Sequence, residues 1–180
     1  NDALGRHQAP KEDRKRAHTL LNLGFVMQEM ERFDAAEQYY EQARLLAAAT
    51  SNEQTLGIAL GNLGDLASQR NNHERAVELC EQAAQHLEKC GRFENVARAL
   101  LPLARLEMSR GDVAECEKLI ERTNRMLDRG ASEMLGGEVG ARLRSILDEW
   151  GALEQDLVTK CIDAASDEKS RASVIERGWM

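Results

Sequence analysis

The sequence predicts an all-α fold built from stacked, repeated helix hairpins. The chain has 180 residues, of which 42% are hydrophobic and 31% charged, enough to bury a substantial core. Aromatic residues make up 4% and there are 2 prolines, so helix formers fill most positions and strand formers are scarce. Leu23-Gly24 recurs as Leu63-Gly64 after 40 residues, and Leu103-Ala104 follows after another 40. Such a period indicates stacked units, because one unit alone cannot bury its apolar face.

The recurrence covers the whole unit. The short segment Glu41-Gln42-Ala43 returns unchanged as Glu81-Gln82-Ala83. Matching positions also recur in the second half of each copy: Ala36, Tyr40 and Ala43, then Ala76, Cys80 and Ala83, then Cys116, Ile120 and Thr123.

Short breaks rich in Gly, Asn and Asp separate the helical stretches, which is typical of antiparallel helix hairpins. Asp34, Asn72 and Asp112 are predicted helix N-caps, because their side-chain oxygens can accept from the first free backbone N–H groups. Breaks are expected at 31–34, 70–73, 90–93, 110–112 and 128–130. The predicted helices lie near 11–30, 33–49, 53–70, 73–89, 93–109, 112–128, 132–149 and 152–165.

This pattern resembles the tetratricopeptide repeat, whose signature places Leu and Gly in one helix and Ala, an aromatic residue and Ala in the next. The third copy, within 97–126, is weaker, and the fourth is degenerate. The matching residues are Leu20, Leu23, Gly24, Ala36, Tyr40 and Ala43, then Leu60, Leu63, Gly64, Ala76, Cys80 and Ala83, then Leu100 and Leu103, and in the fourth copy Leu143, Leu157, Cys161 and Ala164.

The resemblance implies a single repeat domain over 1–180. Its repeats are expected near 11–50, 51–90, 91–130 and 131–165, with a C-terminal cap or tail at 166–180. The 40-residue period is similar to the repeats of kinesin light chains, Leu-Gly-Asn adaptors and bacterial regulators. In those relatives the helix hairpins form a right-handed superhelical solenoid whose concave groove binds a peptide.

The net charge and hydropathy of the chain limit the kinds of partner and the cellular location that we expect. The formal net charge of −7 argues against a general nucleic-acid surface, which requires clustered Lys and Arg. No apolar run reaches the roughly 18 to 20 residues that span a bilayer, and the first 16 residues do not resemble a signal peptide. We therefore expect a cytoplasmic protein with no membrane contact. Because the first residue is Asn1 and the helical pattern begins almost at once, we also expect a segment of a longer protein.

No catalytic constellation emerges. The four cysteines form no CxxC pair, so we expect reduced packing thiols and no metal. The four histidines are scattered, and there is no phosphate-binding loop or dinucleotide fingerprint. The chain is therefore expected to be neither an enzyme nor a cofactor-binding protein. The cysteines are Cys80, Cys90, Cys116 and Cys161, and the histidines are His7, His18, His73 and His86.

Helical geometry, at 100° per residue, separates a packing face from a polar face on the first helix of each unit. Leu20, Leu23, Gly24 and Met27 fall on the packing face. The resemblance implies that the opposite face lines the concave groove. On that face we expect Asn22, Phe25 and Glu29, then Asn62, Asp65 and Gln69, then Arg98, Pro102, Arg105 and Ser109.

Each candidate has two interpretations. Asn22 and Asn62 either hold a peptide main chain, as an amide both donates and accepts, or merely solvate the surface. Pro102, at the equivalent position of the third copy, cannot donate a hydrogen bond, so it interrupts the series formed by Asn22 and Asn62. It is also expected to kink its helix. Phe25 is either an anchor for a partner or is covered by a neighbouring segment.

The two arginines of the third unit also have two interpretations. Arg98 and Arg105 lie two turns apart and can clamp a carboxylate. Alternatively, they are solvated or pair with Asp65 and Glu107.

Two functions of different kind follow. The first is a non-catalytic interaction module that binds a protein peptide or helical segment, in a regulatory or adaptor protein. The alternative is self-association, as a homo-oligomer, or an intramolecular scaffold role in a multidomain signalling or transcription regulator.

Overall fold

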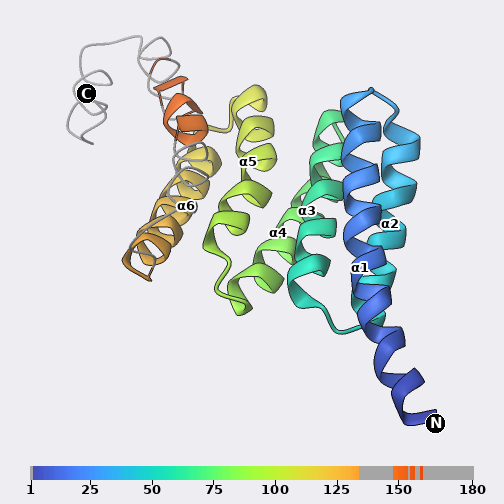
Figure 1. Ribbon diagram of the computed structural model, residues 1–180. Helices are drawn as coiled ribbons and strands as arrows, with labels where there is room; N and C mark the ends of the chain where they lie inside the picture. The colour runs from blue at the N-terminus through green and yellow to red at the C-terminus, as the bar shows by residue number, and fades with distance from the viewer. Residues whose placement is uncertain (1, 134–147, 154, 157–158, 160–180) are drawn as a thin grey trace, which may run out of the picture. The chain divides into compact units, whose positions relative to one another are not determined.

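The computed structural model describes residues 2–133, 148–153, 155–156 and 159, which are helices and short turns without a strand. Six helices follow one another between residues 2 and 133 (Figure 1). They are α1 (Asp2–Glu29), α2 (Phe33–Ala49), α3 (Glu53–Gln69), α4 (His73–Lys89), α5 (Phe93–Arg110) and α6 (Val113–Glu133). The all-α prediction is confirmed.

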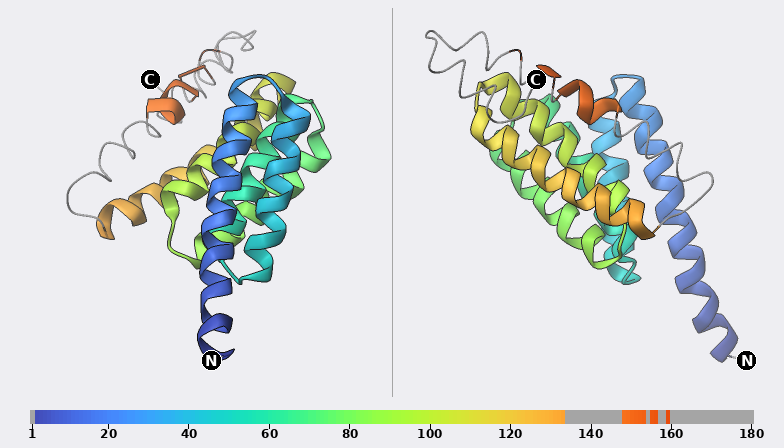
Figure 2. Two further views of the ribbon diagram at one scale, coloured as in Figure 1. Left: turned by 45° about the vertical axis from the view of Figure 1, so that its right-hand side comes forward. Right: turned by 90° about the vertical axis from the view of Figure 1, so that its left-hand side faces the viewer.

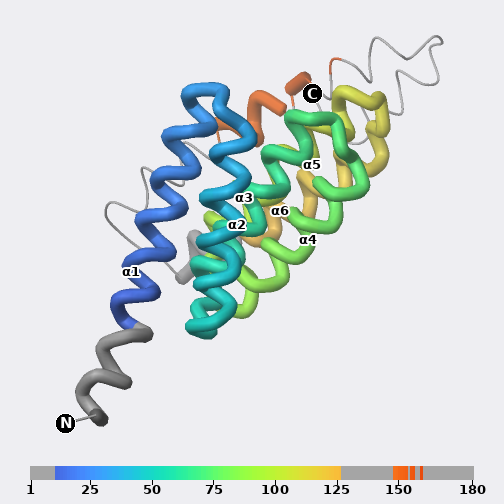
Figure 3. The backbone as a smooth tube through the Cα atoms, turned by 90° about the vertical axis from the view of Figure 1, so that its right-hand side faces the viewer, coloured from blue at the N-terminus to red at the C-terminus, as the bar shows by residue number. Residues whose placement is uncertain are grey.

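Consecutive helices pack as antiparallel neighbours. α1 packs against α2, α2 against α3 and α3 against α4, an order visible from two sides in Figure 2 and along the tube in Figure 3. By its contacts the chain divides within α5 into two compact units, one ending at Leu103 and one beginning at Ala104. The packed pairs are those of a helical repeat solenoid.

The turns between helices recur every 20 residues. In each, one residue has a left-handed backbone, with φ between 49° and 78°. The following residue donates its N–H to a carbonyl five residues back at 2.8 to 3.0 Å, which satisfies the end of the preceding helix. The left-handed residues are Glu31, Ser51, Asn71, Gly91 and Gly111. Each hairpin therefore has the same length, and the 40-residue period is a structural one.

Side-chain caps begin three of the helices. The predicted caps Asn72 and Asp112 are confirmed, whereas Asp34 is not a cap: α2 begins after Arg32, which makes no side-chain cap. Asn52 is a further cap at α3. Their Oδ1 atoms accept from the backbone N–H of Thr55 at 3.2 Å (Asn52), Arg75 at 3.3 Å (Asn72) and Glu115 at 3.1 Å (Asp112).

Close helix contact explains the Leu-Gly pairs. Gly24 lies against the ring of Tyr40, whose side chain is fully buried. A Cβ at Gly64 would stand 2.5 Å from Sγ of Cys80. A Cβ at either position would crowd the side chain of the paired helix, so glycine favours this close approach. The core around the first contact contains Leu20, Leu21, Ala36, Tyr40, Ala43, Ala59, Leu63 and Leu66.

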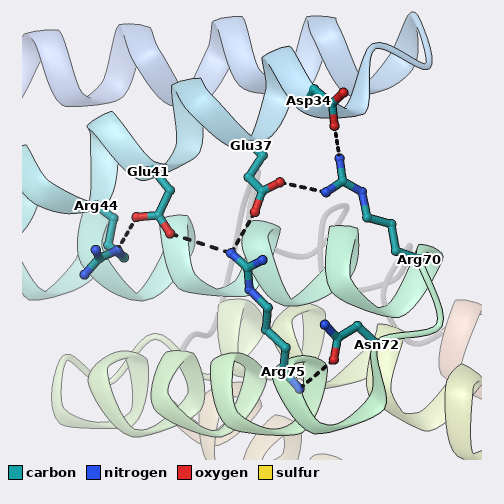
Figure 4. A network of polar contacts seen from close by, with 7 residues as sticks. All are labelled: Asp34, Glu37, Glu41, Arg44, Arg70, Asn72 and Arg75. Atoms are coloured by element: carbon teal, nitrogen blue, oxygen red, sulfur yellow. Dashed lines mark hydrogen bonds and ion pairs between the residues drawn. The ribbon is translucent and has the colours of Figure 1, made fainter.

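An ion-pair network links α2 to the start of α4 (Figure 4). Glu37 of α2 accepts from Arg70 and from Arg75, each at 2.7 Å. Arg70 also contacts Asp34 at 2.6 Å, and Arg75 lies 3.9 Å from Glu41. Glu37 is the centre of this network because it contacts both arginines. Its side chain is partly buried, with 24% exposed.

Several sequence predictions about helix bounds are wrong. α1 begins at Asp2 rather than near residue 11, and α6 continues through the expected break at Gly130 to Glu133. Residues 148–153 are helical across the expected break at 150–151. Helix formers on both sides and packing of the helix outweigh the cost of one glycine, about 1 kcal/mol. The rest of the predicted helices 132–149 and 152–165, and the tail 166–180, lie outside the described residues.

Two packing predictions also fail. Cys80 and Cys116 are buried free thiols, as expected, but Cys90 is exposed because it caps the C-terminus of α4. Cys161 lies outside the described residues. Leu23 retains 38% exposure, although helical geometry placed it on the packing face.

Candidate peptide-binding face

We call the surface formed by seven residues of the first helices of successive hairpins the polar face. Asn22, Phe25, Glu29, Gln69 and Arg98 are exposed, and Asn62 and Asp65 are half-buried. Phe25 keeps 57% of its surface exposed, so the described residues do not cover it. The members are Asn22, Phe25 and Glu29 on α1, Asn62, Asp65 and Gln69 on α3, and Arg98 on α5.

Helix periodicity sets this exposure. Leu20 and Gly24 of α1 are buried, as are Leu60 and Gly64 of α3. Residues two or five positions beyond these buried leucines point away from them at 100° per residue. The polar face therefore repeats with the 40-residue period on α1 and α3.

A hydrogen-bonded chain joins three helices beneath the polar face. Oη of Tyr40 donates to Oε1 of Gln28 at 2.9 Å. Nε2 of Gln28 donates to Oδ2 of Asp65 at 2.5 Å, and Nε2 of Gln69 donates to the same oxygen at 3.0 Å. These bonds hold the Asp65 carboxylate in place and leave Oδ1 without a hydrogen bond among the described residues.

Sequence reasoning did not select Gln28. Its equivalent 40 residues later is Ser68, whose Oγ donates to the carbonyl of Pro102 at 3.1 Å. Both side chains link one first helix to the next. The signal was the recurrence of a polar residue at the edge of the packing face.

Burial and negative charge dominate the electrostatics of this region. Burial, and then the charges of Asp65 and Glu29, raise the pKa of Tyr40 well above its usual value. Burial, followed by Asp65 and Glu81, raises the pKa of the Cys80 thiol to about 12. Both groups are therefore neutral near pH 7, and the α1–α3 part of the polar face is acidic.

The sequence of this region matches a known repeat. Residues 15–89, from α1 to the end of α4, match the family model of the tetratricopeptide repeat. The match supports a tetratricopeptide repeat family. No curated protein has significant sequence similarity to the chain. Repeats of this family generally mediate protein–protein interactions.

The arginines near the tetratricopeptide repeat segment do not pair as expected. Arg98, on the part of α5 in the first unit, has no polar partner among the described residues. Nη2 of Arg105 contacts Oε2 of Glu149 at 3.2 Å within the second unit. Of the two alternatives to a clamp, Arg98 therefore fits the solvated one rather than pairing with Asp65, and Glu107 contacts Arg110 at 3.6 Å. Pro102 lies inside α5.

An apolar surface on α1 was not predicted. Leu23, Val26 and Met30 of α1 are 38%, 48% and 57% exposed. They recur at helical spacing on one side of α1, next to the polar face. We call them the outer face of α1.

The described ranges contain no group of three or more His, Cys, Asp or Glu side chains placed to hold a metal ion. None of the described helices is both long enough and apolar enough to cross a membrane.

Proposed function

We propose that the chain is a non-catalytic interaction module of the long-period tetratricopeptide type, which binds a peptide or helical segment of a partner protein on its polar face. One observation carries this. Positions 22, 25 and 29 of α1 and their equivalents 62, 65 and 69 of α3 remain exposed or half-buried, while Gly24, Leu63 and Gly64 between them are buried. The repeat thus presents the same surface twice.

The residue types suit a peptide of mixed charge. Asn22 and Asn62 can each satisfy a backbone N–H and C=O of an extended segment. The exposed ring of Phe25 offers an apolar contact. Oδ1 of Asp65 favours a basic side chain on the ligand, and Arg98 favours an acidic one.

Arg105, on the second unit, is a separate candidate for binding a carboxylate. Its contact with Glu149 is exposed, with side-chain exposures of 58% and 46%. Such a pair contributes only about 0 to 1 kcal/mol, so a ligand carboxylate can replace Glu149. Because contacts of this kind are individually weak, we expect micromolar affinity, about −8 kcal/mol.

The second candidate function is self-association or scaffolding in a larger cytoplasmic regulator or adaptor, with residues 1–180 acting as one repeat domain. The exposed outer face of α1 favours it, because contiguous apolar surface often marks an interface. Light scattering distinguishes the two: a monomer supports ligand capture, whereas a stable dimer that is unaffected by polar-face substitutions supports assembly.

Affinity capture from native lysate, read by mass spectrometry, tests the first proposal. The chain is compared with an Asn22→Ala, Asn62→Ala, Arg98→Ala variant whose fold is verified by circular dichroism. A Gln42→Ala, Gln85→Ala variant, altered at exposed positions of α2 and α4, serves as the control. Loss of a partner from the first variant alone supports the polar face, and equal capture by all three refutes it.

A further inference from the structure

The polar face of α1 continues toward the N-terminal end of the helix as a row of basic residues, which we call the basic stripe. At 100° per residue, its members lie within about 60° of the mean direction of Asn22, Phe25 and Glu29. All of them are exposed, and all lie in the unit that ends at Leu103. The basic stripe consists of Lys11, Arg14, Lys15 and His18.

Two contacts place the basic stripe beside the neighbouring helices of the same unit. Nη2 of Arg14 donates to the carbonyl of Thr50, just after α2, at 3.2 Å. Nε2 of His18 lies 3.3 Å from Oγ1 of Thr55 on α3, a residue that is fully buried. The stripe therefore borders α3, as Gln28 does further along α1. Neither partner is an anion, so these contacts leave the charge of the stripe uncompensated.

Carboxylates lie at the opposite end of the polar face. Neither Lys11 nor Lys15 forms an ion pair with another described residue. After burial, the charges of Asp65 and Glu29 raise the pKa of Tyr40, so both carboxylates lie near its hydroxyl group. The polar face thus runs from positive at the N-terminal end of α1 to negative at the C-terminal end.

The basic stripe belongs to the first unit alone among the two that share the polar face. Forty residues later, the equivalent positions carry no charge. They are Ser51, Gln54, Thr55 and Ile58. A ligand that recognises only the repeated residues could bind in either of two registers, on α1 or on α3, and the basic stripe distinguishes them.

From this order of charges we propose that the ligand of the polar face is a protein segment with acidic residues at one end, which the basic stripe binds. Basic residues at its other end lie near Glu29 and Asp65. The inference rests on the proposed function and adds the charge order and the position of the ligand. Complementary charges at both ends fix the register of the segment and disfavour segments of the opposite pattern.

A nucleic acid or an anionic membrane fits this surface less well. Such a polyanion would extend along the face and meet Glu29 and Asp65, which repel it. The chain also has a net charge of −7, which opposes the approach of a large anion. A segment that is acidic at one end alone avoids both difficulties.

The probe is the peptide of highest affinity that a random display library yields on the folded chain, measured by fluorescence anisotropy. We expect acidic residues near one of its ends. Lys11→Ala, Lys15→Ala should weaken its binding about three- to tenfold at low salt, and less at high salt, because two exposed charge pairs are lost. The control Arg16→Ala, Lys89→Ala removes the same charge at exposed positions outside the stripe and should change binding less than about twofold.

A second peptide tests whether the lysines contact its acidic end. Replacing the acidic residues of the probe with the corresponding amides should give a peptide that the parent chain and the Lys11→Ala, Lys15→Ala variant bind equally. This double-mutant cycle isolates the charge pairs. Equal binding of the original probe by parent and variant, or an equal loss for both peptides, would overturn the inference.

The polar-face variant Asn22→Ala, Asn62→Ala, Arg98→Ala separates this inference from the proposed function. A probe that is weakened by this variant but not by Lys11→Ala, Lys15→Ala leaves the proposed function standing and refutes the inference. A probe that the polar-face variant binds as tightly as the parent refutes both. Tighter binding of oligothymidylate or phosphatidylserine vesicles than of the probe, or self-association by sedimentation, would also overturn the inference if Lys11→Ala, Lys15→Ala abolished it.

Discussion

Gln28 of α1 donates its amide hydrogen to Oδ2 of Asp65 on α3, and its equivalent Ser68 donates to the carbonyl of Pro102 on α5. Each bond joins the first helix of one hairpin to the first helix of the next. The two bonds lie 40 residues apart along the chain. Neighbouring hairpins are thus held by a polar contact as well as by apolar packing, and in the first case the contact also positions a carboxylate of the polar face.

The Tyr40–Gln28 bond predicts unequal effects of two substitutions. Tyr40→Phe removes the hydroxyl, and half-buried Gln28 can turn to water, so we expect a loss of about 0.5 to 1.5 kcal/mol in the free energy of unfolding. Gln28→Ala leaves the buried hydroxyl without its partner and should cost more, about 1 to 3 kcal/mol. Urea unfolding of both single variants and the double variant measures this. A larger loss for Tyr40→Phe than for Gln28→Ala would contradict it.

The contact of Gly64 with Cys80 predicts overpacking. Gly64→Ala places a methyl group 2.5 Å from Sγ of Cys80 and 3.2 Å from its backbone nitrogen, so we expect a loss of about 1 to 3 kcal/mol. Cys80→Ala in the same chain removes the sulfur and should restore part of that loss. A double-mutant cycle by denaturant unfolding gives the coupling free energy. Simple additivity of the two changes would argue against the contact.

The Cys80 thiol predicts a loss of stability at high pH. Its pKa is raised from 9.0 to about 12 in the folded chain, so between these values the unfolded thiol ionises while the folded one keeps its proton. The stabilising contribution is complete below pH 9 and is lost as the pH rises toward 12. Thermal unfolding across this range should show a shallower decline for Cys80→Ala.

Alkylation of the same thiols provides an independent check on that prediction. At pH 8, mass spectrometry should find exposed Cys90 modified well before Cys80 and Cys116, which are buried. Rapid modification of Cys80 under native conditions would contradict the buried position on which the raised pKa depends.

The ion-pair network predicts that Glu37 matters more than Asp34. Glu37 contacts two arginines and is mostly buried, whereas the side chain of Asp34 is 93% exposed. We expect Glu37→Gln to lower the free energy of unfolding by about 1 kcal/mol, and Asp34→Asn to have a smaller effect. The difference between the two losses should shrink in 1 M salt, because the Debye length is then about 3 Å and exposed charges are screened. Equal effects at low salt would show that burial of Glu37 adds nothing.

The sequence predicted the positions of the turns better than the exposure and contacts of surface residues. Asn71, Gly91 and Gly111 suit a left-handed backbone, so their turns were visible in the sequence. Glu31 and Ser51 have no such preference, and their turns were expected only from Asp34 in the break at 31–34 and from the gap between the predicted helices 33–49 and 53–70. The exposure of Leu23 was not predictable from helical geometry, because it depends on which neighbour is present. The bond from Gln28 to Asp65 joins α1 to α3, between residues that are 37 positions apart in the sequence. No local pattern encodes such a contact.

Peptide binding on the polar face is the central claim, and isothermal titration calorimetry tests it most directly. A peptide selected from a random display library on the folded chain would be titrated into three proteins. They are the parent chain, the Asn22→Ala, Asn62→Ala, Arg98→Ala variant and the Gln42→Ala, Gln85→Ala control. We predict micromolar binding to the parent and the control, and binding at least about tenfold weaker, or 1.4 kcal/mol, to the first variant. Equal affinity for all three proteins would contradict the account.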